Sequence, residues 1–518
     1  MHTAQRRRSP SFRRFTIWCV WFMRAVSRGQ ALGVPLVDRL VISERNSVSV
    51  NDVDLSLCEL DASEMVDGFE SGELSPVEVT DSALGRMTDA EPHIHAMYLI
   101  YHERARAAAA ASAQRWRDRK PLSPIDGVPV TVKENVNLEG EPTPWGSAAS
   151  LPTPASSTAP LLERLTARGA VVLGKTTMPE WGMLSSGVST LHPTTCNPWN
   201  LSWNPGGSSA GAGAAAAAGY APIHFGSDIG GSVRLPASWC GIAGFKPSFG
   251  RIPVDPPYFG RTIGPMGREV EDLARVMGVV SGPDDRDPYS LPPQKISWGD
   301  LEFKTQGLRV GLHLDAGAGT ETSPEIAAAV SDAAQFFESQ GSAVEIVDPF
   351  FSDEMLERVD MFWRAGHWLD YEALPVDRRG LLLEFIAEWC RAGSEVSGLD
   401  AVRSSNAQLE VAIQTLRATQ PYDLVLSPVS PDATYPVDWP MPSNDVTRPM
   451  AHIGFCMPYN MSGQPAASVH CGFTSDGRPI GLQIVGPRFA DREVLAAATH
   501  FQRSHPIDRP WPRPWERP

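Results

Sequence analysis

Hydrophobic and polar residues follow two different spacings along this chain, and the switches between them predict alternating helices and strands. Apolar positions three to four residues apart, or a capping box, predict helices at residues 62–70, 76–88, 104–117 and 159–168. Short apolar runs predict buried strands at residues 127–132 and 171–173. Helices that alternate with strands in this way are typical of an α/β fold.

The C-terminal half shows the same alternation. Strands are predicted at residues 308–313, 343–347, 424–428, 466–471 and 481–485, and helices at 323–340 and through most of 354–414. Residues 185–253 are dense in glycine, serine and alanine, and 210–219 predict a helix of small residues that packs closely against its neighbours. We therefore expect one α/β domain over residues 54–505, with a mixed central sheet flanked by helices.

Both ends of the chain differ from this domain in composition. The first 30 residues contain seven arginines and no acidic residue, and residues 1–50 are expected to be a basic extension, either disordered or a weak export signal. Residues 506–518 are rich in proline and tryptophan and are expected to form a surface strap.

The charge of the body limits its partners. The 518 residues carry a net charge of −15, and because the first 30 residues are basic the remainder is more acidic still. A body this acidic repels phosphate backbones, so we expect no nucleic-acid partner. Hydrophobic residues make up 42% of the chain, enough for a large buried core.

One apolar run raises the question of targeting. Residues 15–23 follow Arg13 and Arg14 and are stopped by Arg24, whereas a helix needs about 20 apolar residues to cross a bilayer. We expect no membrane span and a cytoplasmic protein. A twin-arginine export signal is the alternative, although no cleavage site of the A-x-A type follows.

Cysteine and histidine give no evidence for a metal site. The seven cysteines are widely spread with no C-x-x-C pair, so we expect reduced packing residues. His93 and His95 would lie on one face of a strand and could be two ligands, but no further Cys or His cluster accompanies them. We therefore expect neither a metal nor a cofactor.

Three short sequences match known motifs, and their context argues against each. Residues 169–176 fit the P-loop pattern, but residues 170–173 between its glycines are themselves a predicted strand. Residues 211–216 fit a dinucleotide fingerprint, and 207–211 fit the G-x-S-x-G nucleophile elbow. Both motifs need a preceding strand, whereas Asn204-Pro205 predicts a turn.

Five segments, in order along the chain, resemble the motifs of the amidase signature family, and two of them overlap the sequences just described. They are Gly127-Val-Pro-Val-Thr-Val-Lys133-Glu-Asn, Gly169-Ala-Val-Val-Leu-Gly-Lys-Thr176, Asn204-Pro-Gly-Gly-Ser-Ser209, Gly226-Ser-Asp-Ile-Gly-Gly-Ser-Val-Arg-Leu-Pro-Ala237 and Gly244-Phe-Lys-Pro-Ser-Phe-Gly-Arg-Ile-Pro253. Residues 460–466 and 478–483 extend the resemblance, which spans about residues 60–500 and excludes the first 50. The family often has glycine where this chain has Ala210, a change that removes no reacting group. The resemblance implies a single amidase-signature domain that hydrolyses carboxamides to a carboxylic acid and ammonia or an amine.

The resemblance also implies a catalytic triad of one lysine and two serines. The matching positions are Lys133, Ser208 and Ser232. Ser232 would attack the amide carbonyl and form an acyl-enzyme, Ser208 would relay the proton, and Lys133 in its neutral form would be the general base. An ordinary lysine is neutral in about 0.4% of molecules at pH 8. We therefore expect burial at the strand end to lower the pKa of Lys133.

The loops around these residues have implied supporting roles. The oxyanion would be held by the backbone N–H groups of Ile229, Gly230, Gly231 and Ser232. Gly207 would ease the cis peptide that precedes the relay serine in the family. Asp228 and Arg234 are expected to pair and brace the loop that carries Ser232.

The substrate is less defined than the reaction. By resemblance, Trp145, Trp181 and Met183 approach the acyl pocket and favour an aromatic or apolar acyl group, although core packing would explain them equally well. We expect a small-molecule amide as substrate, and the choice between monomer and homo-oligomer stays open. The alternative function is the glutamine-processing A-type subunit of a tRNA amidotransferase. Against it, residues 356–370 do not resemble that subunit's recognition segment.

Overall fold

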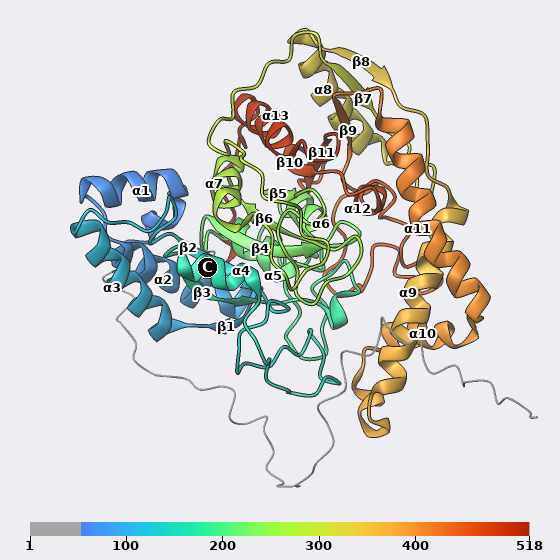
Figure 1. The fold of residues 1–518 in the computed structure, drawn as a ribbon, viewed down its shortest axis with the longest axis horizontal. Helices are drawn as coiled ribbons and strands as arrows, with labels where there is room; N and C mark the ends of the chain where they lie inside the picture. Colours follow the sequence, from blue (N-terminus) through green and yellow to red (C-terminus); the bar gives the residue numbers. More distant parts are fainter. Residues whose placement is uncertain (1–52, 517–518) are drawn as a thin grey trace, which may run out of the picture.

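Eleven strands pair into one sheet in the computed structural model, which describes residues 53–516 (Figure 1). In spatial order they are β1 (Met97–Ile100), β3 (Val171–Thr176), β2 (Pro129–Lys133), β4 (Ile223–Asp228), β6 (Thr262–Gly267), β5 (Ala243–Lys246), β10 (Ala466–Phe473), β11 (Pro479–Val485), β9 (Leu424–Pro428), β7 (Arg309–Leu312) and β8 (Ala343–Ile346). β2 is parallel to β3 and β4, and β7 is parallel to β8 and β9, whereas the other pairs are antiparallel. The predicted mixed α/β sheet is confirmed.

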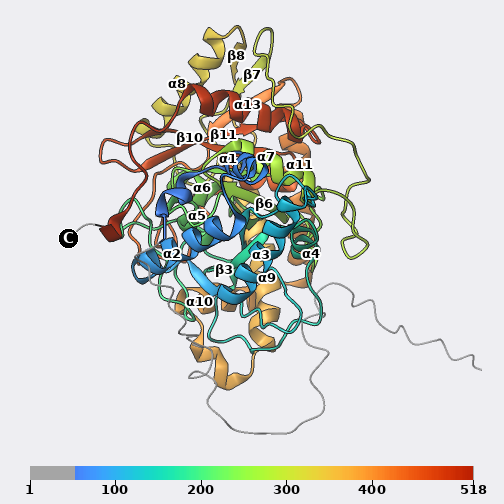
Figure 2. The same ribbon diagram turned by 90° about the vertical axis from the view of Figure 1, so that its left-hand side faces the viewer.

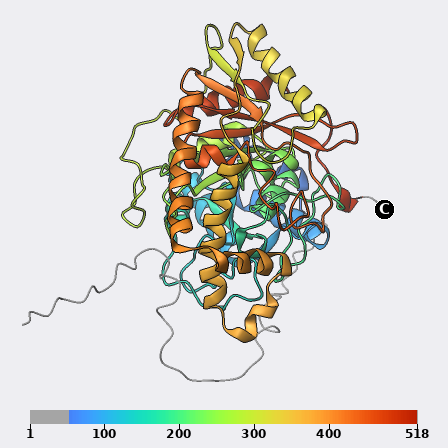
Figure 3. The same ribbon diagram turned by 90° about the vertical axis from the view of Figure 1, so that its right-hand side faces the viewer.

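Helices cover this sheet along its whole length. They are α1 (Ala62–Ser71), α2 (Pro76–Ile94), α3 (His102–Arg117), α4 (Pro160–Ala167), α5 (Ala210–Ala217), α6 (Arg234–Trp239), α7 (Val270–Val280), α8 (Pro324–Ser339), α9 (Asp353–Ala373), α10 (Glu384–Ala392), α11 (Gly398–Thr419), α12 (Met457–Met461) and α13 (Asp491–Ser504). The blue helices α1–α3 gather at the left of the molecule in Figure 1 and face the viewer in Figure 2. The orange helices α9–α11 pack together on the opposite side (Figure 3). Among these helices none is long and apolar enough to cross a membrane.

The two capping boxes start α1 and α2 as the sequence predicts. Asp61 accepts a hydrogen bond from the N–H of Glu64, and the Glu64 carboxylate accepts one from the N–H of Asp61. Ser75 and Glu78 form the same reciprocal pair at the start of α2. α2 runs on to Ile94, six residues past the predicted end.

This longer helix overturns the expectation for the two neighbouring histidines. His93 lies in the last turn of α2, and His95 caps the helix with a φ of 51°, so they do not share a strand face. The physical reason is that Ala90 and Ile94 are buried and hold the last turn against the core. In residues 53–516 no cluster of three or more His, Cys, Asp or Glu side chains is arranged to hold a metal.

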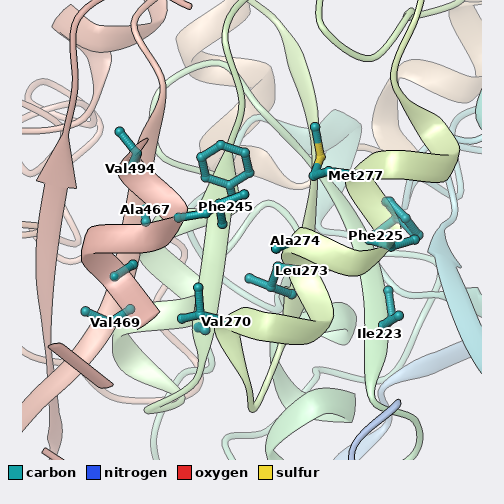
Figure 4. Packing of buried hydrophobic residues seen from close by; sticks show 14 of the residues in the cluster. Ile223, Phe225, Phe245, Val270, Leu273, Ala274, Met277, Ala467, Val469 and Val494 are labelled. Atoms are coloured by element: carbon teal, nitrogen blue, oxygen red, sulfur yellow. The ribbon is translucent and has the colours of Figure 1, made fainter. Parts of the chain in front are cut away.

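The largest hydrophobic core lies between the centre of the sheet and the helices above it. Figure 4 shows Leu273 and Met277 of α7 among side chains of the strands, including Phe225 of β4 and Phe245 of β5. Val494 of α13 joins the same cluster. Burying side chains of this size stabilises the fold by about 1.5–3 kcal/mol each.

The strand β3 explains why the P-loop pattern is misleading. Residues 171–176 of that pattern are extended and buried, so they form no loop around a phosphate. Lys175 points instead toward Glu141, with 3.7 Å between Nζ and Oε2.

The C-terminal tail up to residue 516 lies against the surface of the body. Trp511 packs on the helix cluster that contains Ala212, and the Arg268 guanidinium lies 4.3 Å from the centre of its ring. Arg513 forms an ion pair with Glu59 at 2.7 Å.

Candidate active site

Two parallel strands bring the predicted catalytic segments together. β2 ends at Lys133 and β4 ends at Asp228, and Val132 pairs with Phe225 in the register between them. Because parallel neighbours end at the same edge of a sheet, the residues that follow both strands share one crevice. The helix α5 begins directly after Ser209 and packs on β4, which places the serine-rich loop at the same edge.

Lys133 is fully buried, and its amine is surrounded by serine hydroxyls. Nζ lies 2.8 Å from Oγ of Ser208 and 3.2 Å from Oγ of both Ser209 and Ser227. Burial, assisted by the positive charge of Arg261, lowers the pKa of Lys133 to about 7. A neutral amine has two N–H donors and one lone pair, so three hydroxyls can satisfy it completely.

The loop that carries Ser208 is packed so tightly that only glycine fits before it. The Gly207–Ser208 peptide is cis, as the resemblance implies. A Cβ atom on Gly207 would lie 2.5 Å from the carbonyl oxygen of Ser186 and 2.6 Å from its nitrogen. The buried Asn204 side chain accepts a hydrogen bond from the N–H of Gly206 and fixes the loop from its other end.

Asp228 and Arg234 form the predicted pair and organise the loop that carries Ser232. Both side chains are buried, and Nη2 of Arg234 lies 2.8 Å from Oδ1 of Asp228. Burial opposes the charge of Asp228, but the Arg234 guanidinium outweighs it and holds the pKa of this carboxyl below its usual range. Asn460 and Gln483, from the two C-terminal motifs, accept hydrogen bonds from the same guanidinium at 2.6 and 2.7 Å.

One of the four expected oxyanion donors is already in use. The N–H of Gly231 donates to Oδ1 of Asp228 at 2.9 Å, and the residue has a φ of +115°. Because the N–H of Gly231 is bonded to the carboxylate of Asp228, we no longer count it among the candidate donors to the oxyanion. Ile229, Gly230 and Ser232 remain candidates, and all three line the cavity described next.

A cavity of about 150 Å³ opens onto the serines. It is lined by the three predicted pocket residues Trp145, Trp181 and Met183, together with Lys133, Ser208, Ser232, Tyr258, Arg261, Trp363, His367 and Trp389 among others. Trp145 and Trp181 adopt φ values of 57° and 51°, and the N–H of Trp181 donates to the carbonyl of Trp145 at 2.7 Å. A cavity of about 150 Å³ is large enough to hold one aromatic ring.

The site also contains residues that the motifs did not single out. Ser209 and Ser227 contact the lysine, and Asn135 donates to Ser227 at 3.2 Å. Ser209 and Ser227 lie inside the motifs at residues 204–209 and 226–237, so the sequence could have identified them as candidate site residues. Trp363 and Trp389 come from α9 and α10, more than 100 residues from the triad segments, and no local pattern marks them.

The chain is similar to known amide-processing proteins over most of its length. The family model described as Amidase matches residues 78–495. An acylamidase of Rhodococcus erythropolis is 32% identical over 87% of this chain and 96% of the relative. The A-type subunit of the glutamyl-tRNA(Gln) amidotransferase of Chloroflexus aggregans is 34% identical over 84% of this chain and 94% of the relative.

Solved structures give the same result for the fold. A bacterial aryl acylamidase of the amidase signature family superposes with a TM-score of 0.80 at 29% identity, over 89% of this chain and 99% of that chain. The substrate complex of 6-aminohexanoate cyclic dimer hydrolase gives the same TM-score and coverage at 27% identity.

Proposed function

Because this chain belongs to the Amidase family and is an amide-hydrolysing enzyme, we propose that Ser232, Ser208 and Lys133 carry out its reaction. The observation that carries the proposal is the contact of 2.8 Å between Lys133 and Ser208, in the cavity that also contains Ser232. We assign the catalytic domain to residues 54–505, which contain residues 78–495 matched by the family model. The proposed basic extension, residues 1–50, lies outside the part of the chain that the structure describes.

The first step is the activation of Ser232. A lysine with a pKa of about 7 is neutral in roughly 90% of molecules at pH 8, against about 0.4% for an ordinary lysine. Its N–H groups donate to Ser209 and Ser227, and its lone pair accepts the proton of Ser208. Ser208 in turn accepts the proton of Ser232 as the Ser232 oxygen attacks the carbonyl carbon of the amide.

Acylation follows through a tetrahedral oxyanion. Backbone N–H groups among Ile229, Gly230 and Ser232 stabilise the negative charge on the former carbonyl oxygen. The C–N bond then breaks, and the nitrogen takes a proton from Lys133 through Ser208 and leaves as ammonia or an amine. A water molecule then gives its proton through Ser208 to Lys133 and attacks the carbonyl carbon of the acyl-enzyme. The bond to Ser232 breaks, Ser232 takes the proton back, and the carboxylic acid is released.

The proposed substrate is a small-molecule amide with an aromatic or apolar group. This proposal is supported by the tryptophan-rich lining of the cavity and by the acylamidase and aryl acylamidase relatives. A panel of aryl, fatty-acyl and short aliphatic amides, scored by released amine or ammonia, tests it. Turnover that is absent from the whole panel, or that survives in Ser232→Ala protein, would contradict it.

The tRNA amidotransferase component is the second candidate because several relatives carry that name. It would need partner subunits, and the body of this chain has a strongly acidic composition that disfavours a tRNA surface. Amide hydrolysis by the purified chain alone favours the first function, whereas copurification with partner subunits favours the second. For the first function, a free-standing amide hydrolase, we also propose a cytoplasmic location and no nucleic-acid partner.

A further inference from the structure

Arg261 stands one residue before β6 and lines the catalytic cavity. Its Nη2 group donates to the carbonyl of Pro256, but its Nε is buried and has no hydrogen-bond partner. The guanidinium carbon lies 5.9 Å from the centre of the Trp145 ring and 5.7 Å from that of Tyr258. The aromatic lining of the cavity therefore includes a cation with a spare donor.

This cation is not compensated by an ion pair in the part of the chain that the structure describes. Tyr258, Asp287 and Asp255 attract it electrostatically, but neither aspartate forms an ion pair with it. Among the described residues, Asp228 is the one carboxylate that lines the cavity, and Arg234 already forms an ion pair with it. Burial lowers the pKa of Arg261 to about 10, so the guanidinium stays charged at neutral pH.

A partly buried, unpaired charge is costly unless a ligand compensates it. Water can do so while the cavity is empty, but a substrate that fills the cavity displaces that water. An apolar substrate would then leave the guanidinium without a partner. A carboxylate would accept from its planar N–H donors and remove the penalty.

We propose that Arg261 is a specificity residue that binds a carboxylate carried by the substrate, so that the preferred amides are acidic ones. The inference rests on the proposed function and narrows its substrate class. The aromatic rings beside Arg261 pack on the carbon skeleton of the substrate, and the guanidinium selects its charged group. Lys133, the other basic residue that lines the cavity, is surrounded by three serine hydroxyls and is about 90% neutral at pH 8, so it competes little for the carboxylate at that pH.

A different role for Arg261 makes a different prediction. If its charge served only to lower the pKa of Lys133, its removal would slow every substrate alike and shift the pH profile. Carboxylate binding affects only acidic substrates, chiefly through KM. The two roles are separated by measuring the ratio of kcat/KM for an acidic amide to kcat/KM for its neutral counterpart. The measurement is made at pH 9, where Lys133 is neutral in the wild-type protein.

The experiment compares matched pairs of amides. Glutaryl-4-nitroanilide and pentanoyl-4-nitroanilide differ by one carboxylate on the acyl side, and N-acetyl-4-aminobenzoate and N-acetyl-4-methylaniline differ by one on the amine side. Wild-type kcat/KM is expected to favour the acidic member of at least one pair by about 10-fold or more, as for hydrogen bonds to charged groups. Arg261→Met should abolish that ratio, and Arg261→Lys should retain part of it. Arg358→Met, which removes an exposed arginine of α9, should leave it unchanged.

The possible outcomes are distinct. Hydrolysis of neutral amides without a preference for either acidic member, or a ratio that survives in Arg261→Met, would overturn the inference and leave the proposed function intact. If no amide is turned over and Ser232 takes no acyl probe, the proposed function fails instead. Binding then decides the inference. Calorimetry should detect binding of glutarate to Ser232→Ala protein and no binding to the double variant Ser232→Ala, Arg261→Met. Equal binding by both proteins would refute the role of Arg261.

Discussion

The Nζ atom of Lys133 lies 2.8 Å from the Oγ atom of Ser208, and both atoms belong to buried residues. This contact joins the end of β2 to the loop before α5, two segments separated by 75 positions in sequence. Because burial lowers the pKa of the lysine to about 7, about half of the molecules at pH 7 have a neutral base in contact with this hydroxyl. The predictions below test this arrangement and the loops that support it.

Ser232 should be the residue that becomes acylated. A fluorophosphonate probe is expected to add to Ser232 and not to Ser209, because the Ser209 hydroxyl is buried and engaged by Lys133 and by Ser227. Mass spectrometry of the labelled protein locates the adduct. Ser232→Ala should lose the label, and the assignment fails if labelling continues unchanged in that variant.

Lys133 should control the pH dependence of acylation. Only the neutral amine accepts a proton, so with a pKa of about 7 the value of kcat/KM should rise about tenfold per unit below pH 7 and level off above it. Lys133→Ala should lose about 10²- to 10⁴-fold. Lys133→Arg keeps the charge but cannot accept a proton, so it should be equally inactive.

The profile of kcat/KM from about pH 6 to 10 measures both effects, after each variant is shown to be folded. Substantial activity in Lys133→Arg would mean that the lysine acts through its charge.

The pair of Asp228 and Arg234 should be essential for stability. Arg234→Met leaves the carboxylate of Asp228 buried without its partner, and the free energy of unfolding should fall by about 3–5 kcal/mol. Denaturant unfolding measures this loss. The matched control Arg358→Met breaks an exposed ion pair with Glu354 and should cost less than about 1 kcal/mol. Equal losses in the two variants would argue against a bracing role.

Gly207 should tolerate no side chain. A Cβ atom there would meet backbone atoms of Ser186 at 2.5–2.6 Å, so Gly207→Ala should displace the loop of Ser208 and abolish most activity. Gly366→Ala is the control, because no atom lies within 4 Å of its added Cβ and alanine favours the helix α9. Melting temperature and kcat/KM of both variants test the difference, and full activity in Gly207→Ala would refute the packing argument.

Removal of residues 1–45 should leave hydrolysis and melting temperature nearly unchanged. The sheet, the cavity and the helices around them are built from residues 53–516, and the family match starts at residue 78. Thermal melts and kcat/KM of the truncated protein give the answer. A loss of folding would show that these residues pack on the body.

Local sequence signals predicted a substantial part of the fold. The capping boxes at Asp61 and Ser75 fix the starts of α1 and α2 because the partner groups are only three residues away. No strand is predicted at β4, β5 or β6, because each lies in a segment rich in glycine or proline and is buried on both faces, which removes the alternation that marks a strand. The ordered motifs identified the family, which the comparisons confirm.

The sequence by itself therefore determined the α/β class and the family and supplied the residues of the proposed triad, because these depend on short segments of fixed order. Tertiary structure alone decided what surrounds Lys133 and what lines the cavity. Arg261, Trp363 and Trp389 reach the site from separate elements, and the N–H of Gly231 donates to Asp228. These relationships depend on long-range packing and on the direction of individual backbone groups, and neither property is recorded in the local order of residues.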